Sequence, residues 1–160
     1  MLKRGKWLAS HLEEVLCVFL FGLMGLILFV NIVSRYLLKF SLAFTEELVV
    51  SLFVWVTLLG SAIAFRQGTH LSFTFLTDRL PLKARKLLLW ISALLGAILF
   101  ALLIYFSILQ IKEEVALKIT SSGIGVPQWW YTIGMPIWSL LVIFRIFQGA
   151  YLACQRAGKT

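Results

Sequence analysis

Four long stretches without a charged side chain limit the fold of this chain more than any other feature of its sequence. The apolar runs within them begin at residues 15, 48, 87 and about 128. A helix that crosses the hydrocarbon core of a membrane needs about 20 mostly apolar residues. We therefore predict membrane spans at residues 15–34, 48–66, 87–111 and 128–152. The last span continues past Arg145, whose side chain is expected to snorkel to the lipid headgroups.

The composition of the 160 residues argues against a water-soluble protein. Apolar residues make up 61% of the chain and charged residues only 14%, whereas soluble chains average roughly 25% charged residues. The net charge of +8 comes from basic residues placed between the spans, which argues against a nucleic-acid-binding domain. We predict a single membrane domain over residues 1–160.

The distribution of basic residues predicts the direction of the spans. The N-terminal tail, the loop after the second span and the C-terminal end carry 11 of the 15 Lys and Arg residues. Cytoplasmic loops carry the excess of Lys and Arg, so both termini are expected in the cytoplasm. The predicted fold is an all-α integral membrane protein with four transmembrane helices and short interfacial helical segments. Ser10 and Glu13 form a capping-box pattern, which suggests that the first helix begins before the membrane, with Leu8, Leu12 and Val15 on its buried side.

Few side chains suit catalysis or cofactor binding. The two histidines, His11 and His70, lie outside the spans, and Cys17 and Cys154 are far apart in the sequence. A membrane haem site needs histidine ligands within the spans, and a hydrolase needs a nucleophile beside a base. We therefore predict neither an enzyme nor a resident cofactor or metal.

Small residues recur at helical spacing in two spans. Ala93, Ala97 and Ala101 are four positions apart in the third span, and Gly60 precedes Ala64 by the same interval. Such stripes let another helix approach closely. The approaching helix belongs either to a partner subunit or to this chain itself, and the pattern leaves both open.

Charged residues gather at the ends of the first two spans. Arg35 ends the first span, and Glu46 and Glu47 open the second. Carboxylates are favourable at a helix N-terminus, and beyond that role Arg35 and one glutamate could tie the two helix ends together or bind another subunit. Arg66 ends the second span close to His70, where the simpler interpretation is an anchor at the membrane surface.

A series of motifs resembles the small membrane subunit of tripartite ATP-independent periplasmic (TRAP) transporters over roughly residues 15–150. The matching positions are Asn31-Ile32-Val33-Ser34-Arg35-Tyr36, Thr45-Glu46-Glu47-Leu48, Phe53-Val54-Trp55, Leu59-Gly60, Arg66, Gly68, His70, Leu80-Pro81, Val126-Pro127-Gln128-Trp129, Tyr131 and Pro136. The Arg-Tyr, Thr-Glu-Glu, Phe-x-Trp, Leu-Gly and Arg-x-Gly-x-His order makes the resemblance specific.

The resemblance implies a scaffold subunit in the bacterial inner membrane. It implies a large multi-span permease as partner, which carries the sodium and substrate sites, and a periplasmic binding protein that delivers an organic acid such as a C4-dicarboxylate or a sialic acid. Sodium coupling is then expected in the large subunit and not in this chain, whose other contacts are with membrane lipid. The candidate positions for subunit contacts are Arg35, Tyr36, Glu46, Glu47, Trp55, Gly60, Arg66, His70, Ala93, Ala97 and Ala101.

A second hypothesis is a stand-alone four-helix membrane protein with a structural or assembly role. It predicts a chain that is stable without a partner, whereas a scaffold subunit requires its large subunit. A membrane enzyme is a third, weaker hypothesis, because it needs an ionisable cluster inside the spans.

Overall fold

A computed structural model of the chain describes residues 2–37, 39, 43–67, 82–121 and 125–157. Its helices are α1 (Leu2–Leu37), α2 (Ala43–Gln67), α4 (Leu82–Ala116), α5 (Trp129–Thr132) and α6 (Gly134–Ala157). The described part is almost entirely helical, and four helices are long and apolar enough to cross a membrane. This confirms the predicted fold class.

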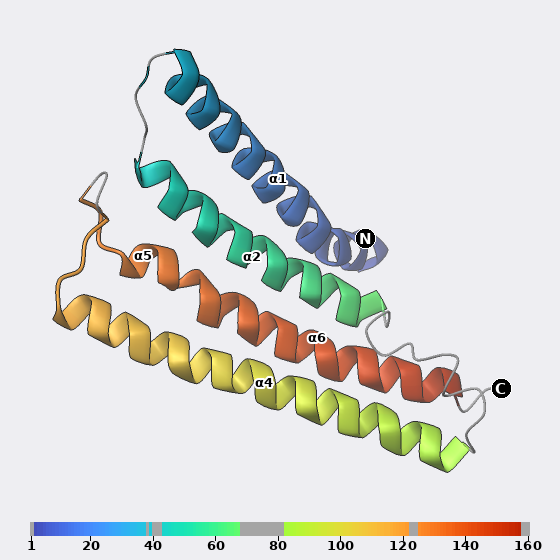
Figure 1. Cartoon of the computed structure of the whole chain (residues 1–160). Helices are drawn as coiled ribbons and strands as arrows, with labels where there is room; N and C mark the ends of the chain where they lie inside the picture. Colours follow the sequence, from blue (N-terminus) through green and yellow to red (C-terminus); the bar gives the residue numbers. More distant parts are fainter. Residues whose placement is uncertain (1, 38, 40–42, 68–81, 122–124, 158–160) are drawn as a thin grey trace.

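The four long helices lie side by side in one row in the order α1, α2, α6, α4 (Figure 1). α6 packs against both α2 and α4, whereas α1 packs against α2 at the edge of the row. The start of α1 and the end of α6 lie at the same end of this row. We call this end the inner end and the opposite one the outer end, following the predicted orientation, which remains a prediction.

The core of the row lies around α6. Val142 and Ile146 of α6 are fully buried and contact Leu58 and Ala62 of α2 and Ala93 of α4. Alanines at these crossings let the helix backbones approach closely, as is usual where apolar helices pack in lipid. The described part of α1 contributes no residue to this cluster.

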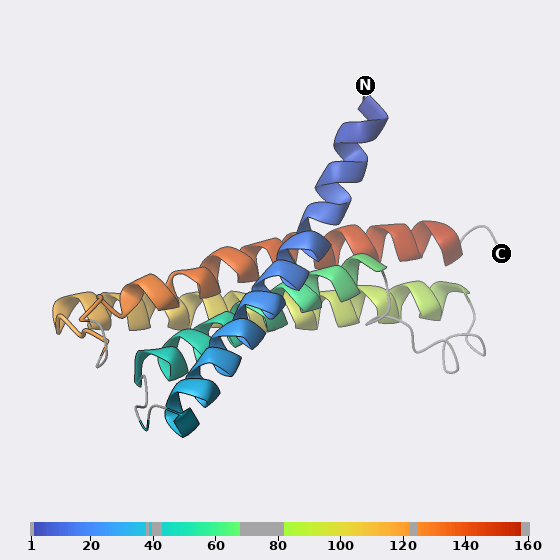
Figure 2. The ribbon, with the colours of Figure 1, turned by 90° about the horizontal axis from the view of Figure 1, so that it is seen from above.

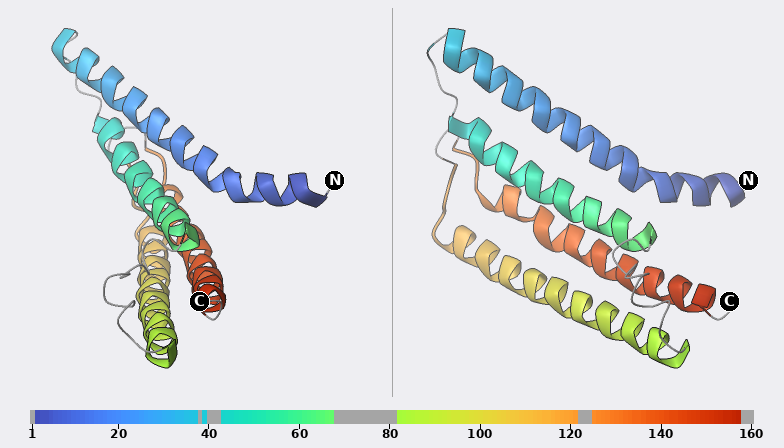
Figure 3. Two further views of the ribbon diagram at one scale, coloured as in Figure 1. Left: turned by 90° about the vertical axis from the view of Figure 1, so that its right-hand side faces the viewer. Right: turned by 45° about the vertical axis from the view of Figure 1, so that its right-hand side comes forward.

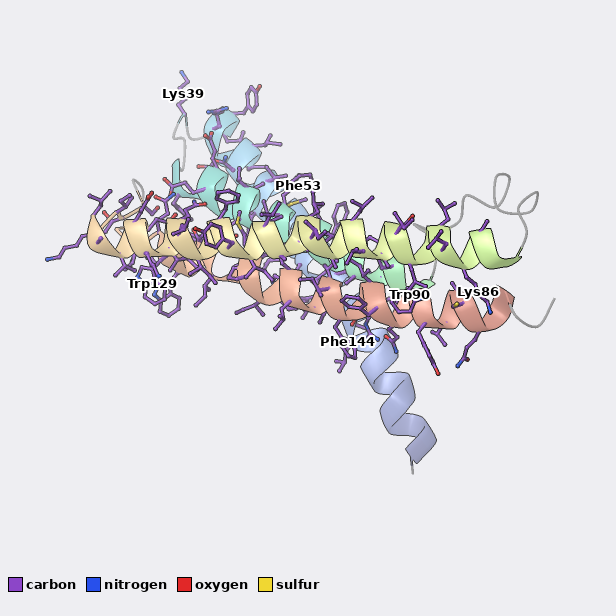
Figure 4. All side chains as sticks on the ribbon, turned by 90° about the horizontal axis from the view of Figure 1, so that it is seen from below. Lys39, Phe53, Lys86, Trp90, Trp129 and Phe144 are labelled. Carbon is purple, nitrogen blue, oxygen red and sulfur yellow. The ribbon has the colours of Figure 1, made fainter. Side chains whose placement is uncertain are left out.

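Apolar side chains project from both broad faces of the row. Phe53 and Phe144 lie on opposite faces in Figure 4, and both are exposed. A broad apolar face is stable only when lipid or another apolar surface covers it. The row therefore has two faces that membrane lipid or a partner subunit can cover.

The helices extend beyond the apolar spans expected from the sequence. α1 has 36 residues and is therefore about 54 Å long, whereas the hydrocarbon core is about 30 Å thick. Its first turns point away from the plane of the row (Figures 2 and 3). Helix ends do not mark the membrane surface, so the span boundaries remain predictions.

The first helix begins before the first apolar span, as expected, but the helix start at Ser10 and the buried side assigned to Leu12 and Val15 are wrong, and the side chain of Leu8 lies outside the described part. α1 begins at Leu2, which places Ser10 inside the helix. Leu12 and Val15 are 59% and 65% exposed, whereas Glu13 between them is buried. The Glu13 carboxylate faces the neighbouring helices because these helices carry arginines that pair with it.

The connection from α4 to α6 is compact. Lys118 has φ 50°, and this left-handed residue follows the last turn of α4 as a C-terminal cap. Ser121 and Gln128 then donate backbone hydrogen bonds to Val126 and Ile119. The helix is interrupted at Ile133, three residues before Pro136, because proline has no N–H to bond to the carbonyl of Thr132. Pro136 therefore accompanies a break between α5 and α6.

Candidate functional site: polar clusters at both ends of the row

A cluster of two acids and two arginines joins three helices at the inner end. Arg145 of α6 donates from Nε to Oε1 of Glu13 in α1 at 2.7 Å, and its Nη2 lies 2.6 Å from the same oxygen in an ion pair. Arg66 of α2 pairs with Glu14, and its Nη1 lies 3.9 Å from Oε2 of Glu13. We call these four residues the inner clamp. Their charges balance, and the clamp connects α1 to α6 as well as to α2.

The inner clamp is largely shielded from solvent. The side chains of Glu13, Arg145 and Arg66 are only 8%, 13% and 15% exposed. Ion pairs that have lost most of their water add little net stability but strongly disfavour arrangements that separate them. The clamp therefore fixes how α1 sits against the rest of the row.

The contacts of the two arginines in the inner clamp differ from those expected from the sequence. Arg145, expected to snorkel to the lipid headgroups, pairs with Glu13, which the sequence did not indicate. Arg66 is part of a buried network and not only a surface anchor. The sequence signal that could have shown this cluster is the position of the charges, because Glu13 precedes the first predicted span, Arg66 ends the second and Arg145 lies in the inner half of the fourth.

At the outer end, α1 and α2 are joined by a weaker pair. Arg35 and Glu46 lie 3.7 Å apart, with side chains 59% and 64% exposed. This is the tie expected between the two helix ends. Exposed ion pairs contribute about 0–1 kcal/mol to the free energy of unfolding. The Arg35–Glu46 pair therefore adds little to the stability of the fold.

A second group of polar contacts joins α2, α4 and α5 at the outer end. Glu47 accepts a hydrogen bond from the Ser121 hydroxyl. The buried Glu114 accepts bonds from Nε2 of Gln110 and Oγ1 of Thr132, both at 3.0 Å. These bonds join the start of α2 and the end of α4 to the turn that leads into α6.

Trp55 and Gly134 form the tightest contact of this group. The indole N–H of Trp55 donates to the carbonyl of Tyr131 at 3.2 Å. The ring lies directly over Gly134, where a Cβ atom would come within 2.2 Å of Trp55 Cε2. The absence of a side chain at residue 134 therefore allows α2 and α6 to meet.

A half-open crevice of about 380 Å³ opens beside these contacts. Glu46, Glu47, Val50 and Val54 of α2 line one side, and Gln110 and Met135 face them from α4 and α6. We call it the outer crevice.

The remaining candidate positions are dispersed. Ala93 and Ala97 are buried in the chain's own core, whereas Ala101 is exposed. A Cβ atom at Gly60 would meet nothing within 4 Å, and Tyr36 is exposed. His70 lies outside the described residues. The stripe in α4 thus serves packing within this chain at two of its three alanines, and partner contacts at any of these positions remain predictions.

Over the residues that the structure describes, no three His, Cys, Asp or Glu side chains group closely enough to hold a metal ion. The described carboxylates of the two clusters contact arginine, hydroxyl or amide groups, most of them from another helix or from the turn after α4. The chemistry of both clusters is therefore that of joining helices.

Together, the row of apolar helices and the polar ties at its ends define a multi-pass membrane protein. Residues 24–156 match the model of the DctQ component of tripartite ATP-independent periplasmic transporters. The match covers most of the chain, and the chain belongs to this family.

Individual relatives support the same assignment. SiaT, a sialic acid TRAP transporter permease protein of Haemophilus influenzae, is 34% identical over 139 residues, which are 87% of this chain and 22% of SiaT. SiaQ, a sialic acid TRAP transporter small permease protein of Vibrio cholerae, is 26% identical over 90% of this chain and 82% of its own. A Haemophilus influenzae protein assigned to the TRAP small permeases is 33% identical over 99 residues, 62% of each chain. The chain thus spans less than two thirds of two of these three proteins, and all three are transporter components, not enzymes.

Proposed function

We propose that this chain is the fixed scaffold subunit of a TRAP transporter, packed against a large permease subunit in the bacterial inner membrane. The large subunit carries the substrate and sodium sites, and a periplasmic binding protein delivers the substrate. Relatives are named for sialic acid, C4-dicarboxylate and ectoine transport. All of these substrates carry a carboxylate, so we infer uptake of an organic acid driven by a sodium gradient.

The observation that carries the proposal is the single-row architecture. Exposed apolar side chains cover both faces of the row, and polar ties connect its helices at both ends. Such a row offers a rigid wall against which a larger membrane protein can pack. The match to SiaT supports this interpretation, because a segment like this chain forms only about a fifth of that longer permease protein.

The stand-alone hypothesis accounts less well for this architecture. A chain that functions by itself gains most from a closed bundle, in which each helix packs against two neighbours. Here α1 lies at one edge and α4 at the other (Figure 1). The open row favours a partner.

An uptake assay tests the proposal. Membrane vesicles that contain the large permease, with or without this chain, are given the binding protein and a radiolabelled carboxylate. We expect uptake only with this chain present and only under an inward sodium gradient. Equal uptake without the chain, or uptake that follows a potassium gradient equally well, would contradict the proposal.

Replacing Glu47 with alanine tests how the outer end contributes. The change removes the hydrogen bond from Ser121 and a charge from the start of α2, at an expected cost of about 1–2 kcal/mol. We expect a lower yield of the permease complex and a proportional loss of uptake. The matched control is Glu113→Ala, an exposed carboxylate at the same end, which should change neither. A normal yield of complex with lost uptake would instead point to a direct role of Glu47 in transport.

A further inference from the structure

The outer crevice combines two carboxylates with a mostly apolar lining. Glu46 and Glu47 lie in the first turns of α2, and Val50, Val54 and Met135 form walls farther along. Seven positions separate Glu47 from Val54, which corresponds to about 10 Å along the helix axis. Carboxylates at the start of α2, followed by apolar side chains along the helix, match the order of groups in a membrane lipid, in which a polar headgroup is followed by acyl chains.

The charges of these carboxylates select the type of headgroup. Two carboxylates favour a cation that can donate hydrogen bonds. Glu46 pairs with Arg35 at 3.7 Å and Glu47 with the Ser121 hydroxyl, and an ionised carboxylate has further acceptor positions. We propose that the outer crevice binds a phospholipid with a primary ammonium headgroup, of the phosphatidylethanolamine class. The ammonium donates to Glu46 and Glu47, the phosphate lies toward Arg35, and one acyl chain follows Val50 and Val54.

The spacing of the lining residues along α2 favours a lipid over a basic side chain from another protein. A lysine side chain could pair with the carboxylates, but its four-carbon stem ends well short of the 10 Å that separates Glu47 from Val54 along α2. An acyl chain covers the whole apolar wall. The crevice volume of about 380 Å³ holds a headgroup and the upper part of one chain, and the remainder of the lipid stays in the bilayer. The proposal does not depend on which substrate the transporter carries.

Lipid titration followed by native mass spectrometry tests the proposal. The protein is purified from its membrane in mild detergent with the subunit that accompanies it, stripped of lipid, and titrated with dioleoyl-phosphatidylethanolamine. The phosphatidylcholine with the same chains is the matched probe, because its trimethylated ammonium has no N–H to donate. Phosphatidylglycerol, which has no cation, is the second probe. We expect one ethanolamine lipid to bind about tenfold more tightly than either, as charge-assisted hydrogen bonds require.

Three variants locate the binding. E46Q/E47Q should reduce ethanolamine-lipid affinity to the level of the choline lipid, and Val50→Trp should abolish it by filling the crevice. Glu113→Gln, an exposed acid outside the crevice, should leave it unchanged. Circular dichroism confirms that each variant remains helical. Equal affinity for the three lipids, unchanged binding in E46Q/E47Q, or loss of the lipid whenever the permease is bound would overturn the proposal.

Discussion

Replacing Glu13 with alanine should destabilise the chain by about 3 kcal/mol. Glu13 accepts a hydrogen bond from Nε of Arg145, forms an ion pair with its Nη2 and lies next to Arg66. Without it, two largely buried arginines share the single carboxylate of Glu14. Removing one partner of a buried ion pair costs about 3–5 kcal/mol, and the lower part of this range applies because both guanidinium groups retain some exposure. Unfolding in mixed detergent and dodecyl sulfate, followed by tryptophan fluorescence, measures the change.

Two further variants separate charge from packing in the inner clamp. Glu14→Ala should cost less, because the Glu14 side chain is 38% exposed. The double variant Glu13→Leu with Arg145→Met removes a charge from each side and should regain much of the lost stability, since apolar side chains replace buried ion pairs well. If Glu13→Ala unfolds like the wild type, or if the double variant is no more stable than Glu13→Ala, the inner clamp does not fix α1 in this way.

Replacing Gly134 with alanine should destabilise the chain by a similar amount. The new Cβ would lie 2.2 Å from Cε2 and Nε1 of Trp55. The indole cannot turn aside without losing its hydrogen bond to the Tyr131 carbonyl. Overpacking costs about 1–3 kcal/mol and a lost hydrogen bond about 1 kcal/mol, so we expect about 3 kcal/mol by the same unfolding assay.

Gly60→Ala is the matched control for this change. It introduces the same methyl group into α2 where nothing lies within 4 Å. Because alanine favours a helix over glycine by about 1 kcal/mol, this variant should be neutral or slightly stabilising. A loss of stability from alanine at residue 134, without a loss at residue 60, would assign the effect to the contact with Trp55. Equal stability of the two variants would show that α2 and α6 do not meet as closely as described.

The helices themselves could be predicted from the sequence, because hydrophobicity and length act locally. The four apolar stretches correspond to the four long helices, and Arg35 and Glu46 meet because consecutive helices bring their joined ends together. Both features depend only on neighbours along the chain. The sequence also matches the family through the same segments.

The order of the helices and their polar contacts could not be predicted in this way. Glu13 and Arg145 are 132 positions apart, and nothing local shows that α1 reaches α6. The capping-box pattern at Ser10 gave the wrong helix start, since a local signal yielded to a helix that continues to Leu2. Small residues at Ala93 and Ala97 indicated that some helix comes close, but only the structure shows that this helix is α6.

The central claim is that this chain is a scaffold that requires a large permease, and co-purification tests it most directly. The chain is tagged, extracted from its native membrane in mild detergent, and everything that accompanies it is identified and quantified by mass spectrometry. A scaffold subunit brings one large multi-span permease at a near-equal ratio. A chain that emerges alone, folded and monodisperse would contradict the claim and favour a stand-alone membrane protein.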